Sequence, residues 1–482
     1  MNIQEAKQEI ANTLRAYLRK DPDGNYVFPA VRQRPILLMG PPGIGKTAIM
    51  EQVAAECGVG LVAYTMTHHT RQSAIGLPHI VKKHYGGQEF TATEYTLSEI
   101  IASVYETMER SGCREGILFL DEINCVSETL APTMLQLLQN KTFGNHKVPE
   151  GWVIVGAGNP PEYNKSVREF DVVTLDRVRQ IDVEADLEVW LDYARAADVH
   201  GAVISYLTIK KDRFYVMNQE EERQVFVTAR GWEDLSELLK SYEKSGIPFG
   251  AEQALQFLHH EEIARDFAAY SALYRKYGSD YGVSELLEGS LPSAEYQEKT
   301  AMAAGGDFEE RFTVVNLLLE QLQSDFRHYE REDRLVTRVH EILQQEGCVP
   351  EAPGADEDTQ VVRRLEEMRL SVRENHLYEK KAVQEHLRGL FQEDVDRRAN
   401  LVARLRARLE TAFCWLEECF GGDSPEMILF VGSLTRNPEA MDFIAQHGCA
   451  PYLKYSEALL FREHEAELQK ACREAILVPE EN

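Results

Sequence analysis

The stretch GPPGIGKT, residues Gly40 to Thr47, decides the fold of this 482-residue chain. It stands between the apolar run ILLM at 36–39, which predicts a strand, and the helical pattern AIMEQVAAEC at 48–57. In that context the pattern G-x-x-x-x-G-K-[ST] predicts a loop whose backbone N–H groups surround phosphate oxygens at the start of a helix. Lys46 would add a positive charge there, and the Thr47 hydroxyl would ligate Mg²⁺. The expected phosphate-binding residues are Gly40, Pro41, Pro42, Gly43, Ile44, Gly45, Lys46, Thr47 and Ala48.

Three further apolar runs extend this pattern into a sheet. GLVAYTM at 60–66, GILFL at 116–120 and WVIVGAG at 152–158 alternate with helical patterns. Continuous apolar strands separated by helices are typical of a parallel sheet that is covered on both faces. We therefore expect an α/β nucleotide-binding domain over residues 1–185.

Polar residues directly follow two of these predicted strands. Asp121 and Glu122 follow the run at 116–120, and Asn159 follows the run at 152–158. An Asp at a strand end can hold the shell of Mg²⁺, the next Glu can polarise water for attack on a γ phosphate, and a neutral amide can position that water. Asp121 is thus a predicted metal ligand, and Glu122 and Asn159 are predicted catalytic residues.

Composition limits the partners of the chain. The sequence has 79 acidic and 52 basic side chains, a formal net charge of -27 that repels nucleic acid and anionic membranes at long range. The eight cysteines are scattered without a C-x-x-C pair, which predicts reduced thiols in a cytoplasmic protein. No apolar stretch approaches the roughly 20 residues needed to cross a bilayer, so we expect no membrane insertion.

Beyond residue 185 the pattern becomes helical almost throughout. We expect a helical lid over 186–287, a linker of small and polar residues over 288–310, and an α-helical extension over 311–482. Residues 347–360 carry two prolines and four acids without a base, which predicts an exposed, mobile loop. Apolar residues between 383 and 416 recur at helical spacing, which suits a helical hairpin, a coiled-coil arm or an ordinary helix bundle.

With these motifs in this order, the chain resembles AAA+ ATPases, and specifically the MoxR family of the dynein-related AAA+ branch. The resemblance rests on GPPGIGKT at 40–47, ILFLDE at 117–122, GAGNP at 156–160, LDRVR at 175–179 and TARGWEDLS at 228–236. These motifs span about half of the chain. The resemblance implies a P-loop AAA+ core followed by an all-α lid, with ATP and Mg²⁺ as cofactors. It also implies a homo-oligomer, commonly a hexameric ring.

The same resemblance assigns roles to two arginines. The arginine of the family's L-D-R motif acts on the nucleotide of a neighbouring subunit, which carries over to Arg177. An arginine in T-P-R-x-W-E patterns senses the nucleotide of its own subunit, which carries over to Arg230. Here Ala229 replaces the proline, and LDRV replaces the family's LDRF. Arg179 therefore remains an alternative finger, or else a surface salt bridge.

Two segments predict hairpins of the kind that line the central pore in this branch. The Gly-Gly pair at 86–87 and the Gly-Asn pair at 144–145 would each form a two-residue turn between strand-like arms. Tyr85, Phe143 and His146 are then candidates for contact with a substrate. The alternative is that these hairpins pack between subunits.

The residues and the resemblance together predict an ATPase that converts ATP and water to ADP and phosphate and that remodels or matures a protein partner. MoxR-like proteins commonly act on a partner with a von Willebrand factor A domain, so such a partner is expected. One alternative is a nucleic-acid-stimulated motor or restriction-type NTPase, which the acidic composition disfavours. Another is a nucleotide-gated scaffold in which the helical extension does the work.

Overall fold

The structure is a computed structural model, and it describes residues 1–143, 146–163, 167, 170–220, 223–346, 349 and 358–458. The chain divides into two compact units. Unit 1 comprises Met1–Tyr193, Lys211–Ser241 and Glu252–Ala264. Unit 2 comprises Ala194–Lys210, Tyr242–Ala251 and Arg265–Asn482. The boundaries therefore pass through the region predicted as a lid, which contributes segments to both units.

Unit 1 is built on a five-stranded parallel sheet in the order β2-β5-β8-β1-β9. Its strands are β1 (Ile36–Met39), β2 (Gly60–Thr65), β5 (Gly116–Asp121), β8 (Trp152–Gly158) and β9 (Arg179–Asp182). The helices that pack on it are α1 (Ile3–Tyr17), α2 (Ala48–Cys57), α4 (Glu99–Ser111) and α5 (Ala131–Asn140). Short helices α3 (Arg71–Ile75) and α6 (Val172–Leu175) lie in the connections.

Two apolar cores lie on opposite faces of this sheet. Leu38 and Phe119 pack with residues of α1 and α2, whereas their neighbours Leu37 and Leu118 pack with residues of α4 and α5. Alternate side chains of a strand point to opposite faces, so a strand between two cores is apolar at every position. This explains the continuous apolar runs of the sequence and confirms the expected α/β class.

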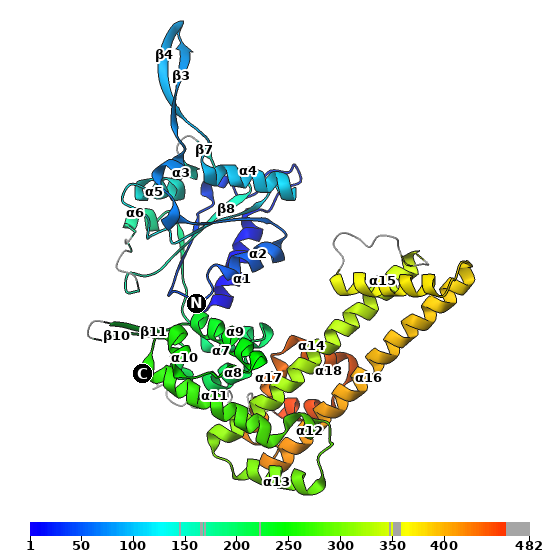
Figure 1. Ribbon diagram of the computed structural model, residues 1–482. Helices are drawn as coiled ribbons and strands as arrows, with labels where there is room; N and C mark the ends of the chain where they lie inside the picture. The colour runs from blue at the N-terminus through cyan, green and yellow to red at the C-terminus, as the bar shows by residue number, and fades with distance from the viewer. Residues whose placement is uncertain are drawn as a thin grey trace, which may run out of the picture. The chain divides into compact units, whose positions relative to one another are not determined.

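A hairpin projects from unit 1, as Figure 1 shows. Its strands β3 (Pro78–Tyr85) and β4 (Gln88–Tyr95) pair antiparallel around glycines 86 and 87, which have φ of 58° and 83°. Two successive positive φ values are what a tight hairpin turn requires, so this prediction is confirmed. The second predicted hairpin pairs β6 (Thr142–Phe143) with β7 (His146–Lys147), and its expected turn at 144–145 lies outside the described residues.

The lid region differs from the all-helical expectation. It contains helices α7 (Leu187–Ala196), α9 (Ala229–Ser245) and α10 (Ala251–Leu258), but also an antiparallel pair, β10 (Val216–Glu220) and β11 (Arg223–Val227). Val216 pairs with Val227 and Met217 with Phe226. β-branched and aromatic residues of this kind favour strands, and that preference outweighs the helical context here.

In the described part of unit 2, all regular secondary structure is helical. The helices are α8 (Gly201–Ile209), most of α11 (Glu261–Tyr281), α12 (Val283–Leu287), α13 (Ser293–Gly305), α14 (Phe308–Glu346), α15 (Thr359–Glu374), α16 (Lys380–Phe420), α17 (Pro425–Thr435) and α18 (Pro438–His447). The prediction of a linker over 288–310 is wrong, because α13 occupies most of it. Ala, Glu, Gln and Lys dominate that segment and are strong helix formers. Most of the predicted mobile loop at 347–360 lies outside the described residues.

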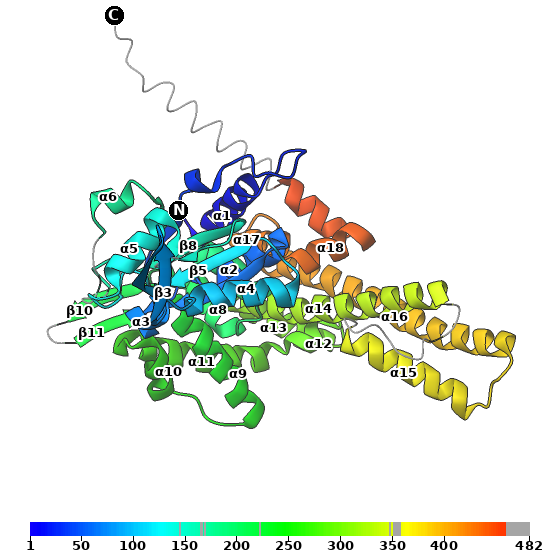
Figure 2. The ribbon, with the colours of Figure 1, turned by 90° about the horizontal axis from the view of Figure 1, so that it is seen from above.

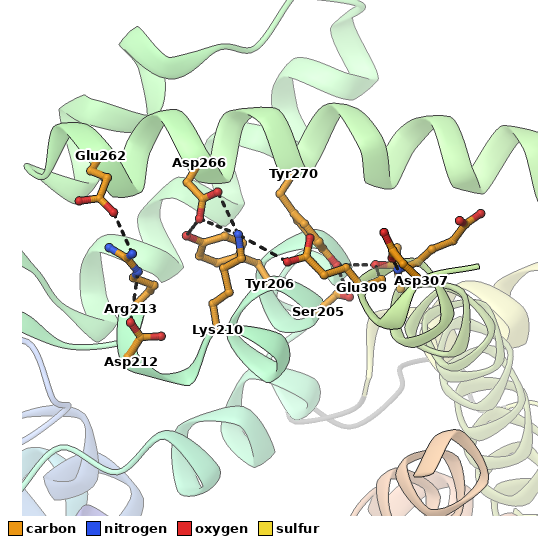
Figure 3. Close-up of polar contacts among 12 residues, drawn as sticks. Ser205, Tyr206, Lys210, Asp212, Arg213, Glu262, Asp266, Tyr270, Asp307 and Glu309 are labelled. Carbon is orange, nitrogen blue, oxygen red and sulfur yellow. Dashed lines mark hydrogen bonds and ion pairs between the residues drawn. The ribbon is translucent and has the colours of Figure 1, made fainter. Parts of the chain in front are cut away.

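Long helices and polar contacts organise unit 2. α14 and α16 have 39 and 41 residues and run side by side (Figure 2), so the 383–416 pattern belongs to one long helix. Figure 3 shows how α8 is tied to α11: the Tyr206 hydroxyl donates to Asp266 over 2.8 Å, and Lys210 Nζ lies 2.9 Å from both Asp266 oxygens. None of the described helices is long and apolar enough to cross a membrane.

Candidate active site

Lys46 lies at the centre of the phosphate loop and is 8% exposed. Its Nζ donates to the carbonyl oxygens of Gly40 and Pro41, each at 2.8 Å, and to Asn159 Oδ1 at 2.9 Å. Burial lowers the pKa of Lys46 to about 8, and the carboxylate of Asp121 opposes this shift. The structure thus brings Lys46 and Asn159 together. Among the residues that the structure describes, no carboxylate lies within hydrogen-bonding distance of Lys46 Nζ.

The loop around Lys46 has the backbone geometry of an anion cradle. Gly43 and Gly45 have φ of +73° and +93°, a region that favours glycine, and α2 begins at Ala48 directly after the loop. A Cβ at Gly43 would lie 3.1 Å from the side chain of Thr228, so this position is also closely packed. The exposed amides of a helix start together with a buried cation fit a nucleotide phosphate.

The structure brings together Thr47 and Asp121, the two predicted metal ligands. The hydroxyl of Thr47, the residue directly before α2, donates to Oδ2 of Asp121, the last residue of β5, over 2.8 Å. Two protein oxygens, completed by phosphate and water, suit Mg²⁺, which usually keeps several waters. Elsewhere in the described residues, no group of three or more His, Cys, Asp and Glu side chains is arranged to hold a metal.

Glu122 is held by a residue that the sequence did not reveal. The Thr67 hydroxyl donates to Glu122 Oε2 over 2.8 Å, and the Glu122 backbone has a positive φ of 54°. Thr67 follows β2, the neighbour of β5 in the sheet, so both residues emerge at the carboxyl edge. The contact directs the carboxylate of Glu122 toward β2. A polar residue just after a strand was the available signal, but the strand order needed to use it is not apparent from sequence.

Asn159 is positioned by a second residue that was not predicted. Asn124 Nδ2 donates to the Asn159 carbonyl oxygen over 2.8 Å. A Cβ at Gly158 would lie 2.6 Å from Asn124 Oδ1, so glycine is required next to Asn159. This contact fixes the backbone after β8 and leaves the Asn159 side chain directed to Lys46.

Arg230 is joined to the phosphate loop through its backbone. Its N–H donates to the Gly43 carbonyl oxygen over 3.2 Å, while its side chain is exposed. The next residue but one, Trp232, is fully buried and donates its indole N–H to the Phe214 carbonyl oxygen over 3.1 Å. The start of α9 is therefore anchored beside the phosphate loop.

Two cavities flank the phosphate loop within unit 1. The first, which we call the base cavity, has a volume of about 400 Å³ and is lined mainly by apolar residues, among them Ile3, Ile44, Ile49, Val189, Trp190 and Phe214. The second, which we call the hairpin cavity, has a volume of about 740 Å³ and is lined by Pro42, Met217, Val225, Phe226, Arg230 and Phe257, among others. The apolar lining of the base cavity suits the flat face of a nucleobase.

Arg177 and Arg179 differ sharply in their surroundings. Arg179 donates to the Thr13 hydroxyl over 2.6 Å and pairs with Glu9, both on α1 of the same chain. Arg177 is exposed, and it precedes β9, whose residue 179 is in register with Ile36 of β1. Arg177 thus lies at the amino edge of the sheet, whereas the phosphate loop follows the carboxyl end of β1. The structure does not bring Arg177 to the other predicted site residues.

The three residues predicted to contact a substrate have different environments. Tyr85 is 58% exposed at the end of β3, and His146 Nε2 lies 3.2 Å from the Tyr95 carbonyl oxygen. Phe143 is fully buried in the core beneath α4 and α5, so its prediction as a substrate contact is wrong. Alternate side chains of a strand point to opposite faces, and Phe143 points toward the core.

A comparison with protein-family models matches residues 35–178 to the AAA domain of the dynein-related subfamily. A comparison with curated proteins gave no match. The matched range runs from just before β1 to just before β9 and includes Lys46, Asp121, Glu122 and Asn159. Together with the parallel sheet and the helices on both of its faces, this match identifies residues 35–178 as an AAA-type domain.

Proposed function

We propose that this protein hydrolyses ATP to ADP and phosphate at the junctions of a ring of identical subunits. The observation that carries the proposal is a division of the predicted catalytic groups. Lys46, Glu122 and Asn159 meet at the carboxyl edge of the sheet, whereas Arg177 lies at the amino edge. At about 3.3 Å per residue, β1 alone separates the two edges by roughly 10 Å. A second copy can supply the arginine that a single chain cannot.

The residues suggest a division of labour in the reaction. Lys46 would hold the β and γ phosphates, and Arg230 would contact the γ phosphate from the lid side. Asn159 would orient a water whose oxygen forms the new bond to the γ phosphorus, while the bond to the bridging oxygen breaks. Glu122 would accept the proton of that water once its carboxylate leaves Thr67.

Thr47 and Asp121 would hold Mg²⁺. When bound, the ion neutralises charge on the phosphate oxygens. The base cavity would take the adenine, and its apolar walls would bury the face of the ring.

We also propose that the protein acts on a protein partner, as MoxR-like ATPases do, with a von Willebrand factor A domain protein as the first candidate. The match to the dynein-related subfamily supports the AAA+ class, and the net charge of -27 disfavours nucleic acid. Glu122→Gln should bind ATP without hydrolysing it, and this arrested form is suited to capturing the partner. Tight binding of DNA that stimulates phosphate release would instead favour the alternative function, a nucleic-acid-stimulated motor.

Complementation between two inactive variants tests the shared site. Glu122→Gln keeps its arginine, and Arg177→Ala keeps its carboxylate, so each alone should release almost no phosphate. In a one-to-one mixture, roughly a quarter of the junctions of a head-to-tail ring pair an intact Glu122 with an intact Arg177. Phosphate release should then recover to about that fraction of the wild-type rate. If both variants bind ATP and assemble but the mixture stays inactive, Arg177 does not complete a neighbour's site.

A further inference from the structure

An exposed apolar patch lies directly before Arg177. Val172 is 81%, Val173 56% and Leu175 36% exposed, and we call these three residues the α6 patch. The segment is fixed rather than loose, because the Asp171 side chain accepts from Thr174 N–H over 2.8 Å and Thr174 is fully buried. Water contact of three neighbouring aliphatic side chains is unfavourable, so the patch is a candidate for an interface.

The hairpin cavity offers a surface of matching chemistry. Met217, Val225, Phe226 and Phe257 give it an apolar wall, and the Phe226 ring lies 4.5 Å from that of His259 between centroids. Pro42 and Arg230, which lie beside the phosphate loop, also line this cavity. The cavity thus combines apolar residues with residues of the phosphate site, and the α6 segment combines apolar residues with Arg177.

The hairpin cavity has room for the α6 patch. Arg177 lies two residues beyond the end of α6 and would enter the cavity together with the patch. The hairpin cavity has a volume of about 740 Å³, enough for a few aliphatic side chains together with the arginine stem. Acidic side chains of Glu162 and Asp234 also line the cavity and complement an incoming guanidinium.

We propose that the α6 patch of one copy packs into the hairpin cavity of the next copy and so delivers Arg177 to the phosphates bound there. This inference rests on the proposed function, since it takes the ring and the arginine in trans as given. It adds the contact that would fix how one subunit is positioned against the next. The partner is a second copy of this chain, and the interface is head-to-tail, because the patch and the cavity are different surfaces.

Photo-crosslinking of the full chain tests the contact directly. A p-benzoylphenylalanine replaces Val173 in isotopically light protein, which is mixed with heavy protein in the presence of ATP, both on the Glu122→Gln background. We expect light-to-heavy crosslinks to peptides that contain Met217, Val225 to Arg230, or Phe257. The matched control places the probe at Val31, which is 91% exposed in the same unit and should not label those peptides. Crosslinks from 173 within one copy, or to another surface, would overturn the proposal.

Substitutions give a second, quantitative readout. Burial of one valine side chain corresponds to about a tenfold change in an association constant. Val173→Asp should therefore weaken assembly by at least about tenfold and reduce assembly-dependent phosphate release, with ADP binding by isolated subunits unchanged. Val31→Asp should leave assembly and assembly-dependent phosphate release at the wild-type level. Normal assembly and turnover of Val173→Asp would refute the docking contact.

The two proposals fail in different ways. If the Glu122→Gln and Arg177→Ala mixture recovers phosphate release but the probe at position 173 crosslinks to another surface, the shared site is supported and only the docking contact is refuted. If the mixture shows no recovery, the role of Arg177 in a neighbour's site is refuted, and the docking contact is refuted with it.

Discussion

Nucleotide binding should be coupled to proton uptake at Lys46. Burial lowers the pKa of this lysine to about 8 in the free protein, so above that pH it is mostly neutral. A bound phosphate favours the charged form, because an opposite charge raises the pKa of an amine. Binding at high pH must therefore take up a proton, and the apparent affinity must fall as pH rises.

The size of the effect follows from linkage. If the bound form is fully protonated, the apparent Kd rises by a factor of one plus the ratio of neutral to charged lysine, which is about twofold at pH 8 and about elevenfold at pH 9. At pH 9 each binding event should take up about 0.9 proton. ADP without Mg²⁺ is the suitable ligand, since it contacts the loop without hydrolysis and without metal binding at Thr47.

Isothermal titration calorimetry in buffers of different ionisation enthalpy measures this uptake. Lys46→Arg keeps a charge that does not titrate in this range, so its binding should show no uptake. Lys141 is a matched control, because burial lowers its pKa to about 8 as well, but its Nζ donates to the Ala30 carbonyl oxygen over 2.7 Å, away from the loop. Lys141→Met should retain the full uptake. Uptake that persists in Lys46→Arg and disappears in Lys141→Met would refute the reasoning.

Three further substitutions have distinct expected outcomes. Thr67→Val removes the hydrogen bond that holds the Glu122 carboxylate, so phosphate release in the absence of a protein partner should rise by about fivefold. A loss of phosphate release as large as that of Glu122→Gln would mean that the Thr67 hydroxyl takes part in the reaction itself. Arg179→Ala loses contacts to α1 and should lower the free energy of unfolding by about 1 kcal/mol, because the pair is partly exposed. Assembled alone it should keep its phosphate release, whereas Arg177→Ala assembled alone should lose it. Phe143→Ala should cost about 3–5 kcal/mol in urea denaturation of unit 1, and wild-type stability would contradict its place in the core.

Much of unit 1 could be predicted because its signals are local. The phosphate loop is a contiguous motif between a strand and a helix, and the strands are apolar at every position because both faces are covered. Lys46 and Asn159 are 113 residues apart, but each follows its own strand signal, so their meeting was also expected.

Other features depend on neighbours that sequence does not reveal. Thr67 and Asn124 matter only because β2, β5 and β8 are adjacent in the sheet. The β10–β11 pair was missed because its short strands lie within a helical region, where propensity is a weak guide. The supposed linker at 288–310 has small residues, but they are helix formers without a proline between 293 and 305.

Helix α1 contacts two parts of unit 1 that, in the proposed ring, would serve different subunits. Ile3 at its start lines the base cavity, while Glu9 and Thr13 hold Arg179, two residues beyond Arg177. The helix has 15 residues and would move as a rod of about 22 Å. Any tilt of α1 on occupation of the base cavity would consequently shift the arginine that the same subunit offers to its neighbour. Each subunit would then report its own occupancy to one neighbour in the ring, through the contact of α1 with Arg179 at the start of β9.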